Sequence, residues 1–174
     1  IEPLLFEANV IPSFVIGERK DSKVMAAVAP RITIRMYNEE SYPVRTPSYI
    51  PQVAVYYLAN QKKALNCLVL FGKIAHHSNG QDGNFYNEDN SVNLESGNFA
   101  TNFFELGFLK TSYSNRLKAI KTIKSSIEIH PKSWMLQELH GKYSGLRWQN
   151  SFTSFKFPLN ENKTERANFS LKAE

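Results

Sequence analysis

Long runs in which apolar and polar residues alternate constrain this chain most, because a period of two is typical of β-strands with one apolar face. In Arg31–Tyr37 the side chains of Ile32, Ile34 and Met36 fall on one face of such a strand. Other extended runs cover residues 9–17, 52–59, 64–77, 100–113, 116–130, 142–157 and 167–173. We therefore predict about eight strands and no α-helix.

The predicted strands are long, several of them spanning 10 to 15 residues. Strands in soluble proteins usually have about five or six residues, whereas transmembrane strands need about 9–11, with one face toward lipid. We predict an all-β fold, an antiparallel transmembrane β-barrel, in which residues 1–174 form a single domain. A soluble lipocalin-like barrel would have the opposite polarity, and the alternation alone does not separate the two.

The composition argues against several classes of protein. The net charge is +5, but lysines and arginines are scattered along the chain, so a nucleic-acid partner is not expected. The single cysteine, Cys67, excludes an internal disulfide bond. No apolar stretch approaches the 18 residues or so of a membrane-spanning helix.

Three connecting segments stand out between the predicted strands. Residues 38–51 contain Pro43, Pro47 and Pro51 at intervals of four and are predicted to form an ordered loop. Residues 60–63 are predicted to be a polar turn. The polar stretch 81–98 is predicted to be a long loop, a kind of loop that is often functional or disordered.

The segment Ile74–Gly80 contains a candidate base and a candidate nucleophile. In an extended strand, His76 and Ser78 point to the same face, with Cα atoms about 6.5–7 Å apart. An imidazole could then take the proton of the serine hydroxyl. His77 would face the opposite side, as a histidine of the barrel interior or rim. The competing interpretation is an ordinary histidine and serine at a strand end.

A third polar residue, Asn102, begins the next predicted strand on the equivalent face. The two strands are natural hairpin partners, so Asn102 can lie beside His76. Its amide oxygen would accept a hydrogen bond from the second imidazole nitrogen and fix the tautomer that acts as a base. His130 and His140 have no partner at a comparable spacing and are predicted to be rim residues.

Two short blocks are more specific than the H-x-S tripeptide alone. Residues 41–52 read S-x-P-x-R-x-x-x-Y-x-P-Q, and residues 76–80 read H-x-S-N-G, with Asn102 in the following strand. A weaker similarity covers residues 142–145. In these features and their order, the chain resembles the outer-membrane phospholipase A family of Gram-negative bacteria.

The resemblance implies a twelve-stranded, multi-pass barrel in the bacterial outer membrane, with an active site that faces lipid. It implies a phospholipase A1/A2-type serine esterase that hydrolyses the acyl esters of glycerophospholipids, needs Ca²⁺ and acts as a homodimer. Ser78 then resembles the nucleophile, His76 the base and Asn102 the orienting residue. Gly80 stands at the position whose backbone N–H stabilises the oxyanion.

The resemblance also implies calcium ligands made of neutral oxygens. Ser41 matches a serine of the proline-rich block, and Gln81 matches a position that gives a backbone carbonyl. The family has a further serine four residues before its asparagine, where this chain has Asn98. Ser96 is the nearest hydroxyl and is the predicted third ligand.

Two departures accompany the resemblance. The loop between Gly80 and Asn102 is about ten residues longer than in proteobacterial members, and the chain ends within a predicted strand. We therefore expect a truncated barrel that lacks the last strands of the family. The alternatives are a non-catalytic outer-membrane barrel, acting as a pore or scaffold, and a soluble β-barrel esterase.

Overall fold

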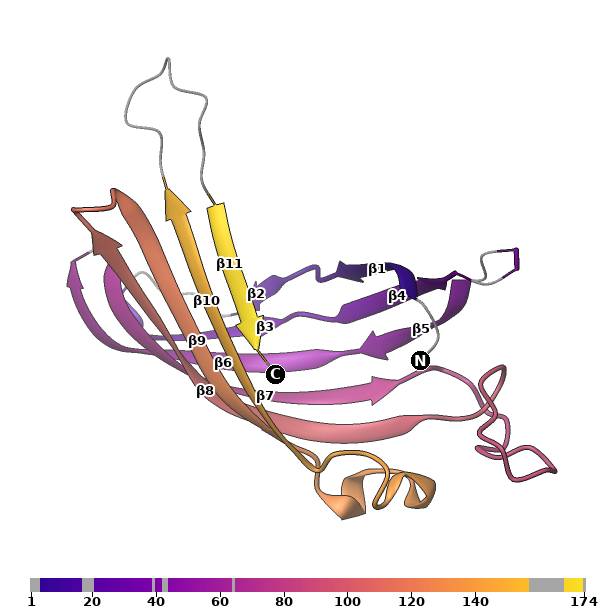
Figure 1. Ribbon diagram of the computed structural model, residues 1–174. Coiled ribbons are helices and arrows are strands. Elements are labelled where there is room, and N and C mark those ends of the chain that lie inside the picture. The colour runs from indigo at the N-terminus through magenta and orange to yellow at the C-terminus, as the bar shows by residue number, and fades with distance from the viewer. Residues whose placement is uncertain are drawn as a thin grey trace.

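The protein is one curved, antiparallel β-sheet (Figure 1). The computed structural model describes residues 4–16, 21–38, 40–41, 44–63, 65–156 and 168–173. The strands are β1 (Leu4–Val10), β2 (Phe14–Ile16), β3 (Val24–Val28), β4 (Arg31–Tyr37), β5 (Val44–Ile50), β6 (Gln52–Lys63), β7 (Asn66–Ser78), β8 (Ala100–Ser114), β9 (Ala119–Ile129), β10 (Leu146–Lys156) and β11 (Asn168–Ala173). Two single turns of 3₁₀ helix, η1 (Lys132–Trp134) and η2 (Gln137–Leu139), lie between β9 and β10.

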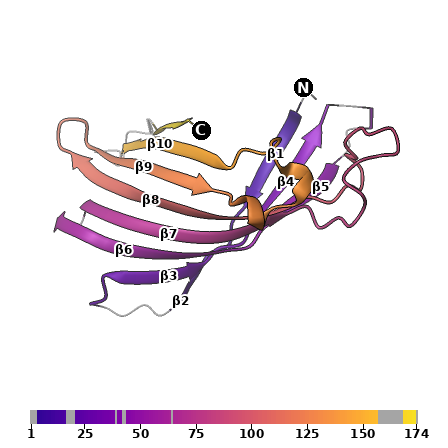
Figure 2. The same cartoon turned by 90° about the horizontal axis from the view of Figure 1, so that it is seen from below.

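The sheet has two arms that meet at β7. One arm has the order β1–β4–β5 and the other β2–β3–β6, and both pair with β7, from which β8 to β11 follow in sequence order. Seen from below, the arm of β1, β4 and β5 turns away from the other strands (Figure 2). In the described part of the chain β11 pairs only with β10, so the sheet is open. The predicted all-β antiparallel fold is confirmed at this level.

Prolines separate the two arms. Pro12 lies between β1 and β2, Pro30 between β3 and β4, and Pro51 between β5 and β6. Proline lacks the N–H that a central strand needs, so pairing is interrupted where prolines from neighbouring strands line up. The eleven strands of the described residues therefore correspond to eight passes of the chain, three of them broken by proline, and eight strands were predicted.

Two predicted connections are wrong, and one strand was not predicted. The predicted strand 9–17 is also interrupted after Val10 by the segment that contains Pro12, and β1 begins earlier, at Leu4. Within residues 38–51, Val44–Ile50 forms β5, because Pro47 falls where the register between β4 and β5 shifts and no ladder N–H is required. The polar residues 60–63 belong to β6, because they continue its ladder with β7. Val24–Val28 forms β3, whose five apolar residues contain no alternation to detect.

The two faces of the sheet differ in polarity. The outer face is apolar and exposed, with side chains between 38% and 57% accessible. It includes Leu70, Ile74, Leu106, Phe108, Ile123 and Ile127. The inner face is concave. Residues of β1 and β4 lie across from residues of β7 to β10, and together they line a polar cavity of about 480 Å³. No helix in the described residues is long and apolar enough to cross a membrane.

A buried ionic cluster holds the inner face of β7, β8 and β9 together. The Glu105 side chain is 1% exposed and forms ion pairs with Lys73 and with Lys124, the latter at 2.8 Å. The Lys73 ammonium lies 5.5 Å from the centre of the Phe103 ring, and that of Lys124 lies 5.1 Å from the Phe71 ring. Burial of these charges is tolerated because each has a partner.

Close packing beside this cluster requires glycine at position 107. A Cβ there would lie 2.5 Å from the backbone oxygen of Ser125 and 2.9 Å from the Phe71 ring. We expect Gly107→Ala to lower the free energy of unfolding by about 1–3 kcal/mol, as overpacking does. Urea unfolding followed by tryptophan fluorescence measures the change. Gly145→Ala is the control, because its new Cβ would make an ordinary 3.5 Å contact, and an equal loss in both variants would contradict the packing argument.

Candidate active site

His76 on β7 and Asn102 on β8 are directly opposite each other in the antiparallel ladder. The sheet register therefore places their side chains on the same face, and His76 Nδ1 lies 2.8 Å from Asn102 Oδ1. The predicted contact between the two residues is confirmed. Both side chains are half-buried on the outer face.

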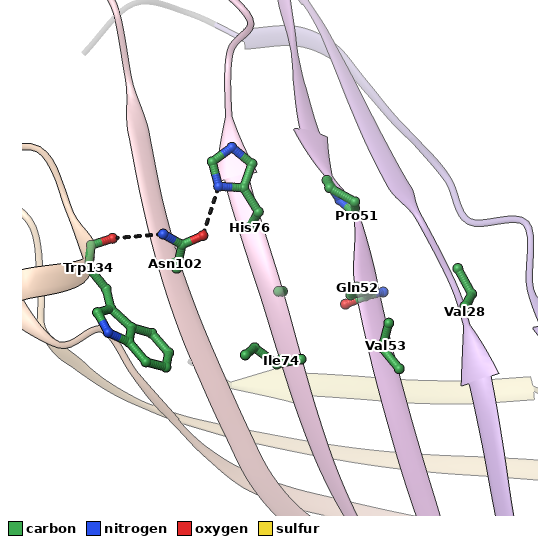
Figure 3. A pocket seen from close by; sticks show the side chains of 9 residues that line it. Val28, Pro51, Gln52, Val53, Ile74, His76, Asn102 and Trp134 are labelled. Carbon is green, nitrogen blue, oxygen red and sulfur yellow. Dashed lines mark hydrogen bonds between the residues drawn. The ribbon is translucent and has the colours of Figure 1, made fainter.

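The tautomer of His76 follows from a second hydrogen bond. Asn102 Nδ2 donates to the backbone oxygen of Trp134 at 3.2 Å, and a carbonyl can only accept. The other amide atom, facing His76, is therefore the oxygen, so His76 Nδ1 must be the donor. In the neutral ring Nε2 is then the acceptor, the atom that can act as a base. In Figure 3 this nitrogen lies on the side of the ring away from Asn102 and from Ile74.

The two motif blocks lie side by side although they are far apart in sequence. Tyr49 of β5 pairs with Ser78 of β7, and the His76 N–H donates to the Pro51 oxygen at 3.1 Å. Gly80, in a left-handed conformation with φ of 69°, packs so closely on Tyr49 that a Cβ would lie 3.3 Å from the ring. The end of β7 and the proline-rich block thus form one local structure.

Ser78 is half-buried two residues beyond His76. In the described structure no hydrogen bond joins the two side chains, although both lie on the same face of β7. Catalytic hydrogen bonds are often long or poorly aligned without substrate. The role of Ser78 as nucleophile, and that of Gly80 as oxyanion donor, stay predictions.

An apolar groove begins at the His76–Asn102 pair. Its volume is about 470 Å³, and its lining continues through Ile74 and Val53 to Val28, while Trp134 stands beside Asn102 at the other end (Figure 3). Apart from His76 and Asn102, its polar lining residue is Gln52. No sequence pattern indicated this groove, because its lining comes from five elements that are separate in the chain, β3, β6, β7, β8 and η1.

His77 and His130 lie away from the His76–Asn102 pair, in different environments. His77 lies on the inner face, as predicted, where it lines the polar cavity and its ring centre lies 4.8 Å from that of Phe99. The rim prediction for His130 is wrong, because this residue is 2% exposed. Its ring nitrogens contact Thr101 Oγ1 at 3.0 Å and Glu128 Oε1 at 2.8 Å.

The Thr101–His130–Glu128 arrangement has the residue types of a hydroxyl–imidazole–carboxylate triad. Thr101 is only 1% exposed, however, so a substrate carbonyl cannot reach its hydroxyl. The Tyr143 ring packs on His130, with 5.0 Å between ring centres, and burial raises the pKa of its phenol. We conclude that this arrangement satisfies buried polar groups and is not a second reactive site.

The predicted calcium ligands are of a suitable chemical type. The hydroxyls of Ser41 and Ser96 and the carbonyl of Gln81 are hard oxygen donors that calcium accepts. Ser96 Oγ accepts a hydrogen bond from Asn93 Nδ2 at 3.0 Å. Among the described residues no hydrogen bond links Ser41, Gln81 and Ser96, and no cluster of three histidine, cysteine or acidic side chains occurs. The ligand set stays a prediction.

The predicted long loop of residues 81–98 has a defined structure, held by hydrogen bonds at its base and at its tip. Asn79 holds its base, because Oδ1 accepts from the Phe99 N–H at 3.0 Å and Nδ2 donates to the Gly97 oxygen at 2.7 Å. At its tip, the Ser91 hydroxyl and N–H donate to Asp89 and hold the pKa of that carboxyl below its ordinary value.

The same loop is attached to neighbouring segments on two sides. Lys142 donates to the Tyr86 hydroxyl, and Gln81 Nε2 donates to Thr46 Oγ1 of β5 at 2.6 Å. The Lys142 ammonium also lies 4.4 Å from the centre of the Tyr86 ring. The loop therefore bridges β5 and the connection between β9 and β10.

Sequence reasoning missed two contributors to the site. The Trp134 carbonyl was not considered, because a backbone oxygen leaves no trace in a sequence pattern. Asn79 could have been found, since asparagine before glycine at a strand end often caps a turn with its side chain. Comparison of the chain with known protein families, with curated proteins and with solved structures found no match.

Proposed function

We propose that this protein is a serine esterase that hydrolyses the acyl ester bonds of glycerophospholipids, with Ser78 as nucleophile, His76 as base and Asn102 as the orienting residue. In this proposal the sheet is part of a transmembrane β-barrel in the bacterial outer membrane, and the active form is a calcium-dependent homodimer.

The observation that carries the proposal is the hydrogen bond between His76 Nδ1 and Asn102 Oδ1. It makes Nδ1 the donor and leaves Nε2, on the side of the ring away from Asn102, as the candidate base (Figure 3). The pair lies on an exposed apolar face, where 53% of the Ile74 side chain is accessible. A hydrolytic site on such a face suits a substrate that is itself dissolved in lipid. The polar inner face and apolar outer face also match the polarity of a membrane barrel.

The reaction follows from these positions. Ser78 Oγ attacks the ester carbonyl carbon while His76 Nε2 takes its proton, and the Gly80 N–H faces the developing oxyanion in this scheme. Collapse of the tetrahedral intermediate breaks the ester C–O bond, and His76 returns the proton to the departing lysophospholipid. Water, activated by His76, then cleaves the acyl-enzyme and releases a fatty acid.

Asn102 contributes by orientation. Its oxygen accepts from His76 and, as an amide, adds no negative charge to an apolar surface. The Trp134 carbonyl holds the amide in this orientation. The oxygens of Ser41, Gln81 and Ser96 would hold calcium, which supplies positive charge near a polarised carbonyl when bound.

Fatty-acid release from phospholipid micelles tests the proposal. With purified wild-type protein we expect release in millimolar calcium, and a loss of at least about a hundredfold on chelation, as when an electrostatic stabiliser is removed. Added calcium should restore the rate. Magnesium should not, because it demands a tighter octahedral site.

Each alternative predicts a different result. Full activity in the chelator would contradict the calcium part alone. Absence of hydrolysis at any calcium concentration would favour a non-catalytic barrel. Extraction without detergent would contradict the membrane location and favour a soluble esterase.

A further inference from the structure

The apolar groove shares His76 and Asn102 with the candidate active site. Any ester held at His76 therefore has the groove within reach of one of its substituents. A phospholipid head group is charged and would leave its charge unpaired against Val53 and Ile74. An acyl chain has no polar group to satisfy, so it is the substituent that the lining accepts.

The ladder registers give the direction of the groove. Val28 of β3 pairs with Val53 of β6, which in turn pairs with Ile74 of β7. Asn102 lies on the next strand, β8, so the groove crosses three interstrand steps, or about 14 Å. A chain in this groove would thus run across the strands, starting at the His76–Asn102 pair and ending at Val28.

Different side chains line the two ends of the groove. Trp134 stands at the end beside Asn102, and Val53 and Val28 follow toward the other end (Figure 3). The side chains of Val53 and Val28 are short and apolar. Within a membrane, an acyl chain that moves from neighbouring lipid tails into the groove gains little free energy, because both surroundings are apolar. The fit of the chain against the groove lining therefore decides which chains bind.

We propose that this groove is the acyl-chain subsite, in which the chain of the scissile ester lies across β7, β6 and β3, and that Val53 and Val28 determine the preferred chain length. The proposal rests on the proposed function, since it needs an ester at His76. Val53 lies midway along the path and Val28 at its far end. A bulky side chain at Val53 should therefore exclude medium and long chains, and one at Val28 only the longest.

The test uses detergent-solubilised protein and p-nitrophenyl esters from butanoate to hexadecanoate. We expect Val53→Trp to lower kcat/KM for hexadecanoate by at least about tenfold, the effect of a few methylenes excluded from a pocket, with less than about a twofold change for butanoate. Val28→Trp should affect hexadecanoate alone. Ile123→Trp is the matched control, because Ile123 and Val53 are both 45% exposed β-branched residues on the outer face, and Ile123 lies outside the groove.

The outcomes separate the subsite from the function. An unchanged length profile in Val53→Trp, or the same change in Ile123→Trp, would overturn the subsite while Ser78-dependent hydrolysis still supported the function. Absence of Ser78-dependent hydrolysis of every ester would overturn both. A selective loss for long esters in the two groove variants supports the subsite.

Discussion

Replacing Ser78 by alanine is expected to lower fatty-acid release from phospholipid micelles by at least about a thousandfold, the scale on which serine hydrolases lose activity with their nucleophile. The reason is that the proposed scheme has a single nucleophile, the Ser78 hydroxyl, from which His76 takes the proton. The measurement is calcium-dependent release by the folded variant, with His76→Ala expected to show a loss of similar size.

The matched control is Thr101→Val, which removes the hydroxyl of the buried Thr101–His130–Glu128 arrangement. This change leaves His130 Nδ1 without its 3.0 Å partner and should cost stability. The turnover of the protein that remains folded should be unchanged. Retained activity in Ser78→Ala together with lost turnover in Thr101→Val would show that the wrong hydroxyl has been chosen.

The largest effect on stability is expected from Glu105→Leu. The substitution leaves Lys73 and Lys124 as unpaired charges beside a tightly packed face, so the free energy of unfolding should fall by about 3–5 kcal/mol. Urea unfolding, followed by tryptophan fluorescence, measures the change. Glu7→Gln is the control, because the Glu7–Arg35 pair is exposed and should contribute at most about 1 kcal/mol. Comparable losses in the two variants would contradict the importance of burial.

Local alternation was sufficient to predict most of the sheet and half of the site. His76, Ser78 and Asn102 could be assigned to one face because a strand has a period of two. The hairpin between β7 and β8 then made the contact between His76 and Asn102 a consequence of register. The side of His77 followed from the same rule.

Features that depend on distant segments could not be predicted in this way. The strand Val44–Ile50 was hidden by Pro47, which is tolerated only because of the register shift against β4. The burial of His130 depends on Thr101 and on aromatic rings from other elements, none of which has a fixed sequence spacing from it. The groove likewise exists only after β3, β6, β7, β8 and η1 are assembled.

The opposite orientations of His76 and His77 restrict how this chain can change length during evolution. Inserting or deleting one residue in β7 ahead of them would exchange their faces and move every following side chain of the strand with them. Point substitutions leave this alternation intact. Length variation compatible with the site is therefore confined to connections such as residues 81–98, which can lengthen while both strand ends keep their register.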